Sequence, residues 1–284
     1  MSNEEQIAYW NGDAGRKWAE KDDMMAAMLG PIARALLEHC DPAGASSVLD
    51  IGCGGGSETL MLAERLRAGS RVLGVDVSAP LLAVAAQRLA EAGELPVAMD
   101  FLQADASEYP FEAGSWDFLF SRFGVMFFDE PVGAFSNLHR ALAPGGTMAF
   151  CCWQRLQDNP WVALPLKAAL EHLPPPPAPE PHAPGPFAFA DRERLARILS
   201  EAGFTAVTIE HRDVTMGWGS GGDLAQTTRE MLNIGPVGRL LAEENEAVRQ
   251  RVYDSAANAL TAYFSDGRIS LPGATWFVTA RRGD

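Results

Sequence analysis

The sequence predicts an α/β fold in which a doubly wound, mostly parallel sheet of seven strands carries helices on both faces and a helical cap. Three observations support this prediction. Short apolar segments alternate with helical segments of about 10–15 residues, which is typical of βαβ units. A glycine cluster directly follows the first apolar segment. Acidic residues lie at or near the ends of the first three apolar segments.

The strands are expected where short apolar segments occur. They read as continuous apolar runs because a parallel sheet covered by helices is buried on both faces. The expected strands are residues 47–51, 71–76, 97–102, 116–121, 147–152, 204–214 and 276–280. Right-handed crossovers make this a Rossmann-like fold, in which the ligand site lies at the carboxyl ends of the strands.

The helices are expected where apolar residues recur every three or four positions. A first helical pattern over residues 13–40 is interrupted at Gly30-Pro31, and the helix that begins at Pro131 is stopped by Pro144-Gly145-Gly146. In the last helical segment, apolar residues recur at every fourth position up to Phe264. The expected helices are 13–40, 58–66, 80–92, 131–142, 159–173, 191–202 and 224–264.

The domain organisation follows from this order of elements. An amino-terminal helical segment (1–44) precedes the ligand-binding core (45–153). A cap insertion (154–186) contains eight prolines within residues 174–186, which excludes helix and central strand there. Residues 187–284 complete the sheet and hold a second cap insertion at about residues 216–268.

The amino-acid composition limits the kinds of partner that the protein is expected to bind. The 284 residues include 23 basic and 37 acidic ones, a net charge of −14, and no basic cluster that would bind nucleic acid or an anionic membrane. The amino terminus does not resemble a signal peptide, and no apolar run approaches the roughly 20 residues of a membrane span. Cys40, Cys53, Cys151 and Cys152 show neither zinc spacing nor a disulfide framework, so a cytoplasmic protein without metal is expected.

The strongest functional signal is the segment Val48-Leu-Asp-Ile-Gly-Cys-Gly-Gly-Gly56. Glycines after a strand permit a tight turn and let a ligand approach the backbone, and the helix beginning near Ser57 directs its N–H groups into the same space. Asp76 ends the second strand, where it can accept hydrogen bonds from a ribose diol. Asp105 follows the third strand and could accept from an adenine amino group.

Two nucleotide interpretations compete for this loop. The dinucleotide fingerprint G-x-G-x-x-G directs a helix terminus at a pyrophosphate. Here Asp50 precedes the first glycine, and a carboxylate would repel a diphosphate but attract an ammonium group. S-adenosylmethionine carries an ammonium and a sulfonium and no phosphate, so Asp50 favours it over a nicotinamide dinucleotide.

The sequence resembles the class I S-adenosylmethionine-dependent methyltransferases over about residues 45–153, and it is most similar to the small-molecule branch that includes quinone-biosynthesis enzymes. The matching segments are Leu49-Asp-Ile-Gly-Cys-Gly-Gly-Gly56, Gly74-Val-Asp-Val-Ser78, Gln103-Ala-Asp-Ala106, Trp116-Asp-Phe118, Ser121-Arg-Phe-Gly124 and Arg140-Ala-Leu-Ala-Pro-Gly-Gly146. The resemblance implies S-adenosylmethionine as cofactor and S-adenosylhomocysteine as product.

The resemblance also implies which residues bind the cofactor. Tyr9-Trp-Asn-Gly12 and Trp18 resemble the amino-terminal lid of this branch, so residues 1–44 are expected to form a lid. By resemblance, the methionine moiety is lined by Gly52, Cys53 and Gly54, the ribose is held by Asp76, the adenine is contacted by Val77, Leu81, Asp105 and Ala106, the sulfonium lies near Ser121 and Phe123, and Trp10 and Trp18 close over the cofactor.

The expected reaction is methyl transfer to a small, apolar or ring-containing metabolite, with cap residues such as Trp161 and Trp218 setting acceptor specificity. No general base is named, because an amine, a thiolate or an activated carbon needs little help. A nicotinamide-dependent oxidoreductase and a non-catalytic partner protein that kept the fold remain as alternatives. The acceptor, the methylated element and the oligomeric state stay open, a homodimer being one option.

Overall fold

The computed structural model describes residues 3–177, 180, 182–219, 221–233 and 235–283. It divides into two compact units. The first comprises Met1–Trp153, His182–Arg212 and Thr275–Asp284, and the second comprises Gln154–Pro181 and Asp213–Ala274. The boundary between the units falls within two long strands, β6 (Thr205–Trp218) and β8 (Arg268–Arg281).

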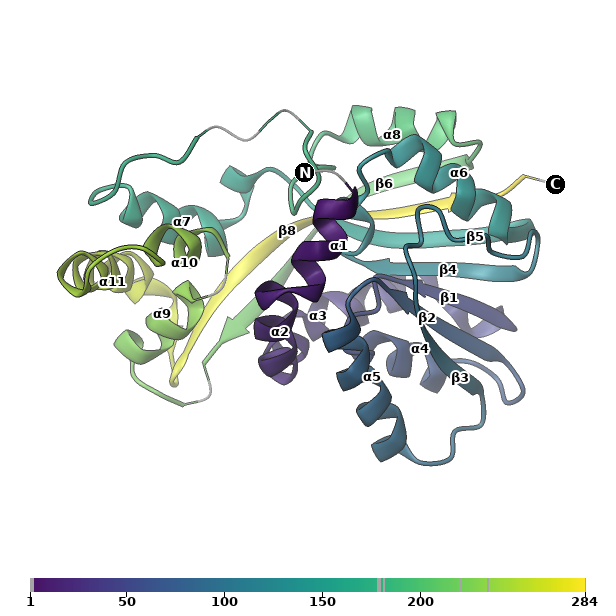
Figure 1. Cartoon of the computed structure of the whole chain (residues 1–284), viewed down its shortest axis with the longest axis horizontal. Helices are drawn as coiled ribbons and strands as arrows, with labels where there is room; N and C mark the ends of the chain where they lie inside the picture. The colour runs from purple at the N-terminus through teal and green to yellow at the C-terminus, as the bar shows by residue number, and fades with distance from the viewer. Residues whose placement is uncertain (1–2, 178–179, 181, 220, 234, 284) are drawn as a thin grey trace. The chain divides into compact units, whose positions relative to one another are not determined.

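The sheet has the order β3-β2-β1-β4-β5-β8-β6, with a further strand, β7, paired to β8 (Figure 1). Strands β1 to β5 are parallel, and β8 runs antiparallel to β5. Their bounds are β1 (Ser47–Ile51), β2 (Arg71–Asp76), β3 (Ala98–Gln103), β4 (Trp116–Arg122) and β5 (Leu142–Trp153). The order reverses between β1 and β4, and such a switch point is where open α/β sheets bind ligands. The predicted doubly wound fold is confirmed.

The strand count was wrong, because the sheet has eight strands and not seven. The additional strand, β7 (Phe264–Ser265), pairs with Arg268 and Ile269 of β8. Asp266 and Gly267 connect the two strands, with φ of 50° and 73°. An Asp-Gly pair with positive φ at both positions is the favoured two-residue hairpin turn. The predicted single helix over residues 224–264 is also wrong: the described residues there form three helices, the last of which ends at Leu260, and Phe264 lies in a strand.

Helices cover both faces of the sheet in the first unit. Helices α3 and α4 pack against each other, and α6 and α8 do so on the opposite side (Figure 1). The bounds are α1 (Asn3–Asn11), α2 (Asp13–Glu20), α3 (Asp22–Cys40), α4 (Ser57–Arg65), α5 (Ala79–Ala92), α6 (Pro131–Ala141) and α8 (Arg192–Glu201).

The expected break at Gly30-Pro31 is wrong, because α3 continues through Pro31. The chain breaks earlier instead, at Lys21 between α2 and α3. A proline removes one backbone hydrogen bond inside a helix. Here Ile32 and Leu36 are fully buried on the same helix, and burial of such an apolar face is what stabilises most protein helices.

The second unit is mainly helical, with α7 (Pro160–Ala169), α9 (Leu224–Leu232), α10 (Pro236–Leu241) and α11 (Glu246–Leu260). Its core contains Ala169, Leu232, Val252 and Ala256. The rings of Trp161 and Trp218 stack with centroids 6.4 Å apart. Residues 178–179 and 181 of the predicted proline-rich segment lie outside the described residues. Among the described helices, none is long and apolar enough to span a membrane.

Candidate functional site

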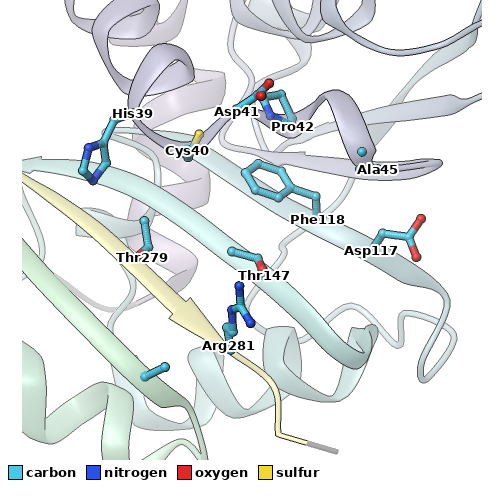
Figure 2. A pocket seen from close by; sticks show the side chains of 12 residues that line it. His39, Cys40, Asp41, Pro42, Ala45, Asp117, Phe118, Thr147, Thr279 and Arg281 are labelled. Carbon is cyan, nitrogen blue, oxygen red and sulfur yellow. The ribbon is translucent and has the colours of Figure 1, made fainter.

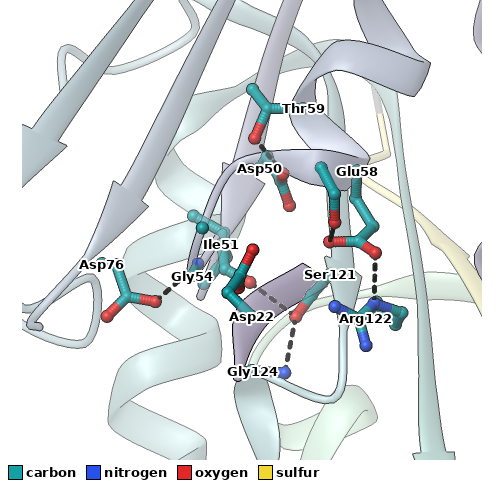
Figure 3. Close-up of polar contacts among 12 residues, drawn as sticks. Asp22, Asp50, Ile51, Gly54, Glu58, Thr59, Asp76, Ser121, Arg122 and Gly124 are labelled. Atoms are coloured by element: carbon teal, nitrogen blue, oxygen red, sulfur yellow. Dashed lines mark hydrogen bonds and ion pairs between the residues drawn. The ribbon is translucent and has the colours of Figure 1, made fainter. Parts of the chain in front are cut away.

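The loops that follow β1 and β4 touch at two glycines. A Cβ on Gly52 would lie 2.6 Å from the Gly124 Cα, and a Cβ on Gly124 would lie 2.5 Å from the Ile51 carbonyl oxygen. Ser121 joins the same two loops: its Oγ donates to the Ile51 carbonyl at 2.7 Å and accepts from the Gly124 N–H at 3.2 Å (Figure 3). The Ser121 side chain is buried and its hydroxyl is engaged within the protein.

The glycine loop between β1 and α4 needs glycine for conformational reasons at Gly52 and Gly56, whose φ values are 70° and 76°. Gly54 leaves room at the loop, because a Cβ there would meet only a methyl of Leu81, 4.0 Å away. Cys53 is buried with its Sγ toward Gly74 of β2, and burial raises the pKa of its thiol. Its thiol therefore packs against the sheet and is not available to a ligand.

Asp50 lies in β1 with 1% of its surface exposed. Its Oδ2 accepts a hydrogen bond of 2.7 Å from the hydroxyl of Thr59, which is buried in the first turns of α4 (Figure 3). Burial raises the pKa of Asp50 from 3.8 to about 7, against the lowering effect of the Thr59 hydrogen bond. Asp50 is thus a carboxyl group whose ionisation is poised near neutral pH and depends on nearby positive charge.

Asp76 anchors the glycine loop to the end of β2. Its Oδ2 accepts from the Gly54 N–H at 2.9 Å, and its Oδ1 accepts from the Ser78 N–H at 2.8 Å. Burial raises the pKa of Asp76, while these backbone hydrogen bonds lower it. The carboxylate is therefore held in one orientation at the strand end where the sequence predicted it.

A buried ion pair beside the loop had no signal in the sequence. Glu58, in the first turn of α4, pairs with Arg122 at the end of β4, with 2.8 Å between Oε1 and Nε. The two side chains are 4% and 16% exposed. The Glu58 Oε2 also accepts from the Ser57 hydroxyl at 2.9 Å (Figure 3). Burial lowers the pKa of Arg122, but the charge and hydrogen bond of Glu58, together with the nearby Cys151 and Asp50, raise it above its usual value.

Asp105 caps its own turn, accepting at Oδ1 from the backbone N–H and the hydroxyl of Ser107 at 2.9 and 2.6 Å. Its Oδ2 accepts from the side-chain amide of Asn3 on α1. Ala106 is buried, and its carbonyl accepts from Asn137 at 3.1 Å. The turn after β3 is therefore tied together by hydrogen bonds, and its Asp105 carboxylate already has a partner on the amino-terminal segment.

Trp10 and Trp18 form one aromatic cluster with Phe127. The Trp10 ring packs edge-on against Trp18 at 5.7 Å and against Phe127, in the loop after β4, at 5.4 Å between centroids. The Trp10 carbonyl accepts from Ser78 at 2.8 Å, and Asn11 donates to the Val77 carbonyl at 2.9 Å. The amino-terminal helices thus contact the loops after β2, β3 and β4, at the edge where Asp76 lies.

Phe123 adopts a left-handed backbone conformation, with φ of 65°, directly after β4. Its ring stacks on Trp153 with centroids 4.1 Å apart and 12° between planes. A non-glycine residue in this conformation is uncommon and clusters at functional sites. Sequence reasoning identified Phe123 but missed Trp153, because the last residue of β5 carries no local sign of this stacking.

A separate hollow of about 440 Å³ lies near the end of α3 and the start of β1 (Figure 2). It is lined by a mixture of charged, polar and apolar residues that includes His39, Asp41, Asp117 and Arg281. Asp117 already accepts from the backbone N–H groups of Ser46 and Ser47. None of the glycine-loop residues lines this hollow.

The methyltransferase domain family matches residues 49–150. Demethylmenaquinone methyltransferase of Thermus thermophilus is 43% identical over 101 residues, which cover 36% of this chain and 44% of that protein. The counterpart from Clavibacter sepedonicus is 31% identical over 185 residues, covering 62% of this chain and 71% of that protein. A solved phosphoethanolamine N-methyltransferase 2 of Haemonchus contortus shares the fold, with a TM-score of 0.59, 20% identity, and coverage of 100% of this chain and 61% of that one.

Fold, glycine loop and these matches agree on one family. The chain belongs to the class I S-adenosylmethionine-dependent methyltransferases. It spans less than half the length of the Thermus relative and of a second relative, nocamycin O-methyltransferase of Saccharothrix syringae, which is 32% identical over 116 residues.

Proposed function

We propose that the protein transfers the methyl group of S-adenosylmethionine to a small, apolar or ring-containing acceptor. The observation that carries this proposal is the pairing of an open glycine loop with two oriented acids. Gly54 leaves space at the backbone, Asp50 lies buried before the loop, and Asp76 is fixed to it by the Gly54 N–H. A loop with these acids suits a cationic amino acid and a ribose diol, and opposes a diphosphate.

The residues present fit the cofactor. Asp50 would face the positive charge of the methionine moiety, the Gly52–Gly54 backbone would lie along it, and Asp76 would hold the ribose hydroxyls. Val77, Leu81, Asp105 and Ala106 would surround the adenine. When bound, S-adenosylmethionine supplies an electrophilic methyl group on a sulfonium.

The chain's own contribution to the reaction is placement. A rigid contact between the β1 and β4 loops, at Gly52 and Gly124, keeps the cofactor-binding backbone in one position. Bringing reacting atoms to about 3–3.5 Å in the right orientation can lower a barrier by about 7–11 kcal/mol. Such placement accounts for methyl transfer to a reactive acceptor without a dedicated base.

The acceptor class is supported by the aromatic cluster of Trp10, Trp18 and Phe127 and by the stacked pair Phe123 and Trp153. Aromatic side chains offer large apolar surfaces and favourable ring–ring geometry to a flat ligand. Two relatives, named demethylmenaquinone methyltransferase and nocamycin O-methyltransferase, support a small-molecule acceptor in the same way.

The test is turnover with methyl-labelled S-adenosylmethionine against a fractionated metabolite extract, with products identified by mass. We expect label in one or a few small apolar products and formation of S-adenosylhomocysteine. Calorimetric titration in parallel should detect S-adenosylhomocysteine binding and no binding of NAD. Measurable NAD affinity without a response to S-adenosylhomocysteine would sink the proposal, and binding without turnover would favour a non-catalytic protein.

A further inference from the structure

A second acid reaches the glycine loop from a distant part of the chain. Asp22, in the first turn of α3, lies directly against the Cα of Gly55. A Cβ on Gly55 would overlap all three atoms of the Asp22 carboxylate. Figure 3 draws Asp22 among the residues of the loop. The absence of a side chain at Gly55 is therefore what admits this carboxylate to the loop.

Arg88 of α5 holds the Asp22 carboxylate in place. Its Nη2 pairs with the Asp22 Oδ2 at 2.8 Å, and its Nη1 donates to the Gly55 carbonyl. The Arg88 and Asp22 side chains are 19% and 14% exposed. Arg88 also pairs with Asp23 at 2.9 Å, but the Asp23 side chain is 99% exposed and points to solvent. Among the described residues, no donor contacts the Asp22 Oδ1.

The other acids near the loop are already engaged. Asp76 accepts a backbone N–H at each oxygen, and Glu58 is paired with Arg122. Four carboxylates, those of Asp22, Asp50, Glu58 and Asp76, stand against two guanidinium groups, those of Arg88 and Arg122. An excess of buried negative charge is unfavourable unless a cation offsets it. The Asp22 side chain is 14% exposed, against 4% for Glu58 and 1% for Asp50, so it is more accessible to a ligand than these two acids.

We propose that Asp22, oriented by Arg88, is a specificity-determining residue that accepts a hydrogen bond from the ammonium group of the cofactor's methionine moiety, whereas the buried Asp50 acts on that group through its charge alone. The inference rests on the proposed function, since it requires S-adenosylmethionine as the ligand. An ammonium–carboxylate hydrogen bond is charge-assisted and stronger than a neutral one. This contact would make the amino-terminal segment part of cofactor recognition.

The experiment compares two ligands that differ only beyond the thioether. S-adenosylhomocysteine carries the amino acid, whereas 5′-methylthioadenosine has the same adenosine and sulfur with a methyl group instead. Calorimetry gives both dissociation constants for wild type, Asp22→Asn and Asp23→Asn. Asp22→Asn should weaken S-adenosylhomocysteine binding by about 10- to 150-fold, the range expected for one charge-assisted hydrogen bond. Its effect on 5′-methylthioadenosine should stay within about twofold, and Asp23→Asn should change neither constant.

A second variant separates orientation from charge. Arg88→Met keeps the Asp22 charge but removes the guanidinium that orients its carboxylate. This variant should therefore lose less affinity than Asp22→Asn, and only for S-adenosylhomocysteine. Arg88→Lys should restore part of the lost affinity. Equal weakening of both ligands, or unchanged affinity in Asp22→Asn, would overturn the inference. Wild-type protein that binds neither ligand would overturn the cofactor assignment, and this proposal with it.

Discussion

Gly52 and Gly124 approach so closely that neither can carry a side chain: a Cβ on Gly52 would lie 2.6 Å from the Gly124 Cα. The two residues come from the loops after β1 and β4, the neighbouring strands at which the strand order reverses. Ser121 closes the same junction through the Ile51 carbonyl and the Gly124 N–H. The switch point of the sheet is therefore a direct backbone contact, and the geometry of the glycine loop depends on it.

Gly124→Ala should lower the free energy of unfolding by about 1–3 kcal/mol, because the new methyl group meets backbone at Ile51 and Gly52 that cannot move aside easily. It should also weaken S-adenosylhomocysteine binding, since the glycine loop must shift. Urea denaturation and calorimetry measure the two effects. Gly133→Ala in α6, where a Cβ would meet nothing within 4 Å, is the matched control and should not destabilise the protein. A Gly124→Ala protein as stable as wild type would show that the junction is loose.

Asp76→Ala should weaken S-adenosylhomocysteine binding by about 10- to 150-fold, since a hydrogen bond to a charged group contributes about 1.5–3 kcal/mol. The variant also frees the N–H groups of Gly54 and Ser78, so some of the loss will come from loop disorder. Asp100→Ala on the edge strand β3 removes an exposed acid away from the loop and should leave the affinity unchanged. Unaltered binding in a folded Asp76→Ala protein would contradict the ribose assignment.

The pH dependence of S-adenosylhomocysteine binding should reflect the ionisation of Asp50. Its pKa in the folded protein is raised by burial to about 7, above the ordinary 3.8, so the unliganded fold favours the protonated carboxyl. The stability contributed by this group is complete below about pH 4 and is lost as the pH rises through about 7. A ligand that brings an ammonium group near Asp50 favours the ionised form, so binding releases a proton below about pH 7.

S-adenosylhomocysteine affinity should therefore rise as the pH increases from about 5.5 to 7 and then level off, with a slope of at most tenfold per pH unit. Calorimetry in two buffers of different ionisation enthalpy counts the released protons. The neighbouring groups that also act on Asp50 are Thr59, Glu58, Arg122 and Asp76. Asp50→Asn should flatten the profile, and an identical profile in that variant would assign the proton to another group.

Arg122→Met should destabilise the fold by about 3–5 kcal/mol, because it leaves the Glu58 carboxylate buried without its partner. Glu58→Gln in the same chain should recover most of that loss, since the remaining groups are neutral. Thermal and urea unfolding of the two single variants and the double variant give the free energies of unfolding for a double-mutant cycle. Additive losses in the double variant would mean that the two side chains do not interact energetically.

Local sequence patterns predicted much of the site. Apolar runs separated by segments of helical periodicity are enough to locate the strands along the chain. An acid at the carboxyl end of a parallel strand must lie at the carboxyl edge of the sheet. The sequence alone therefore places Asp50, Asp76 and the glycines at that edge of the sheet. The predicted break at Gly30-Pro31 failed because a local rule about proline was outweighed by burial of the helix on the core.

What the sequence by itself determined is the order of βαβ units, the glycine loop and the acids at the strand ends, because each is encoded within a few consecutive residues. Only the tertiary structure placed Asp22 on Gly55, paired Glu58 with Arg122 and stacked Phe123 on Trp153. These partners come from different elements, and whether they meet depends on which helix face packs on which strand. That choice is made by burial summed over the whole core, and no local spacing records it.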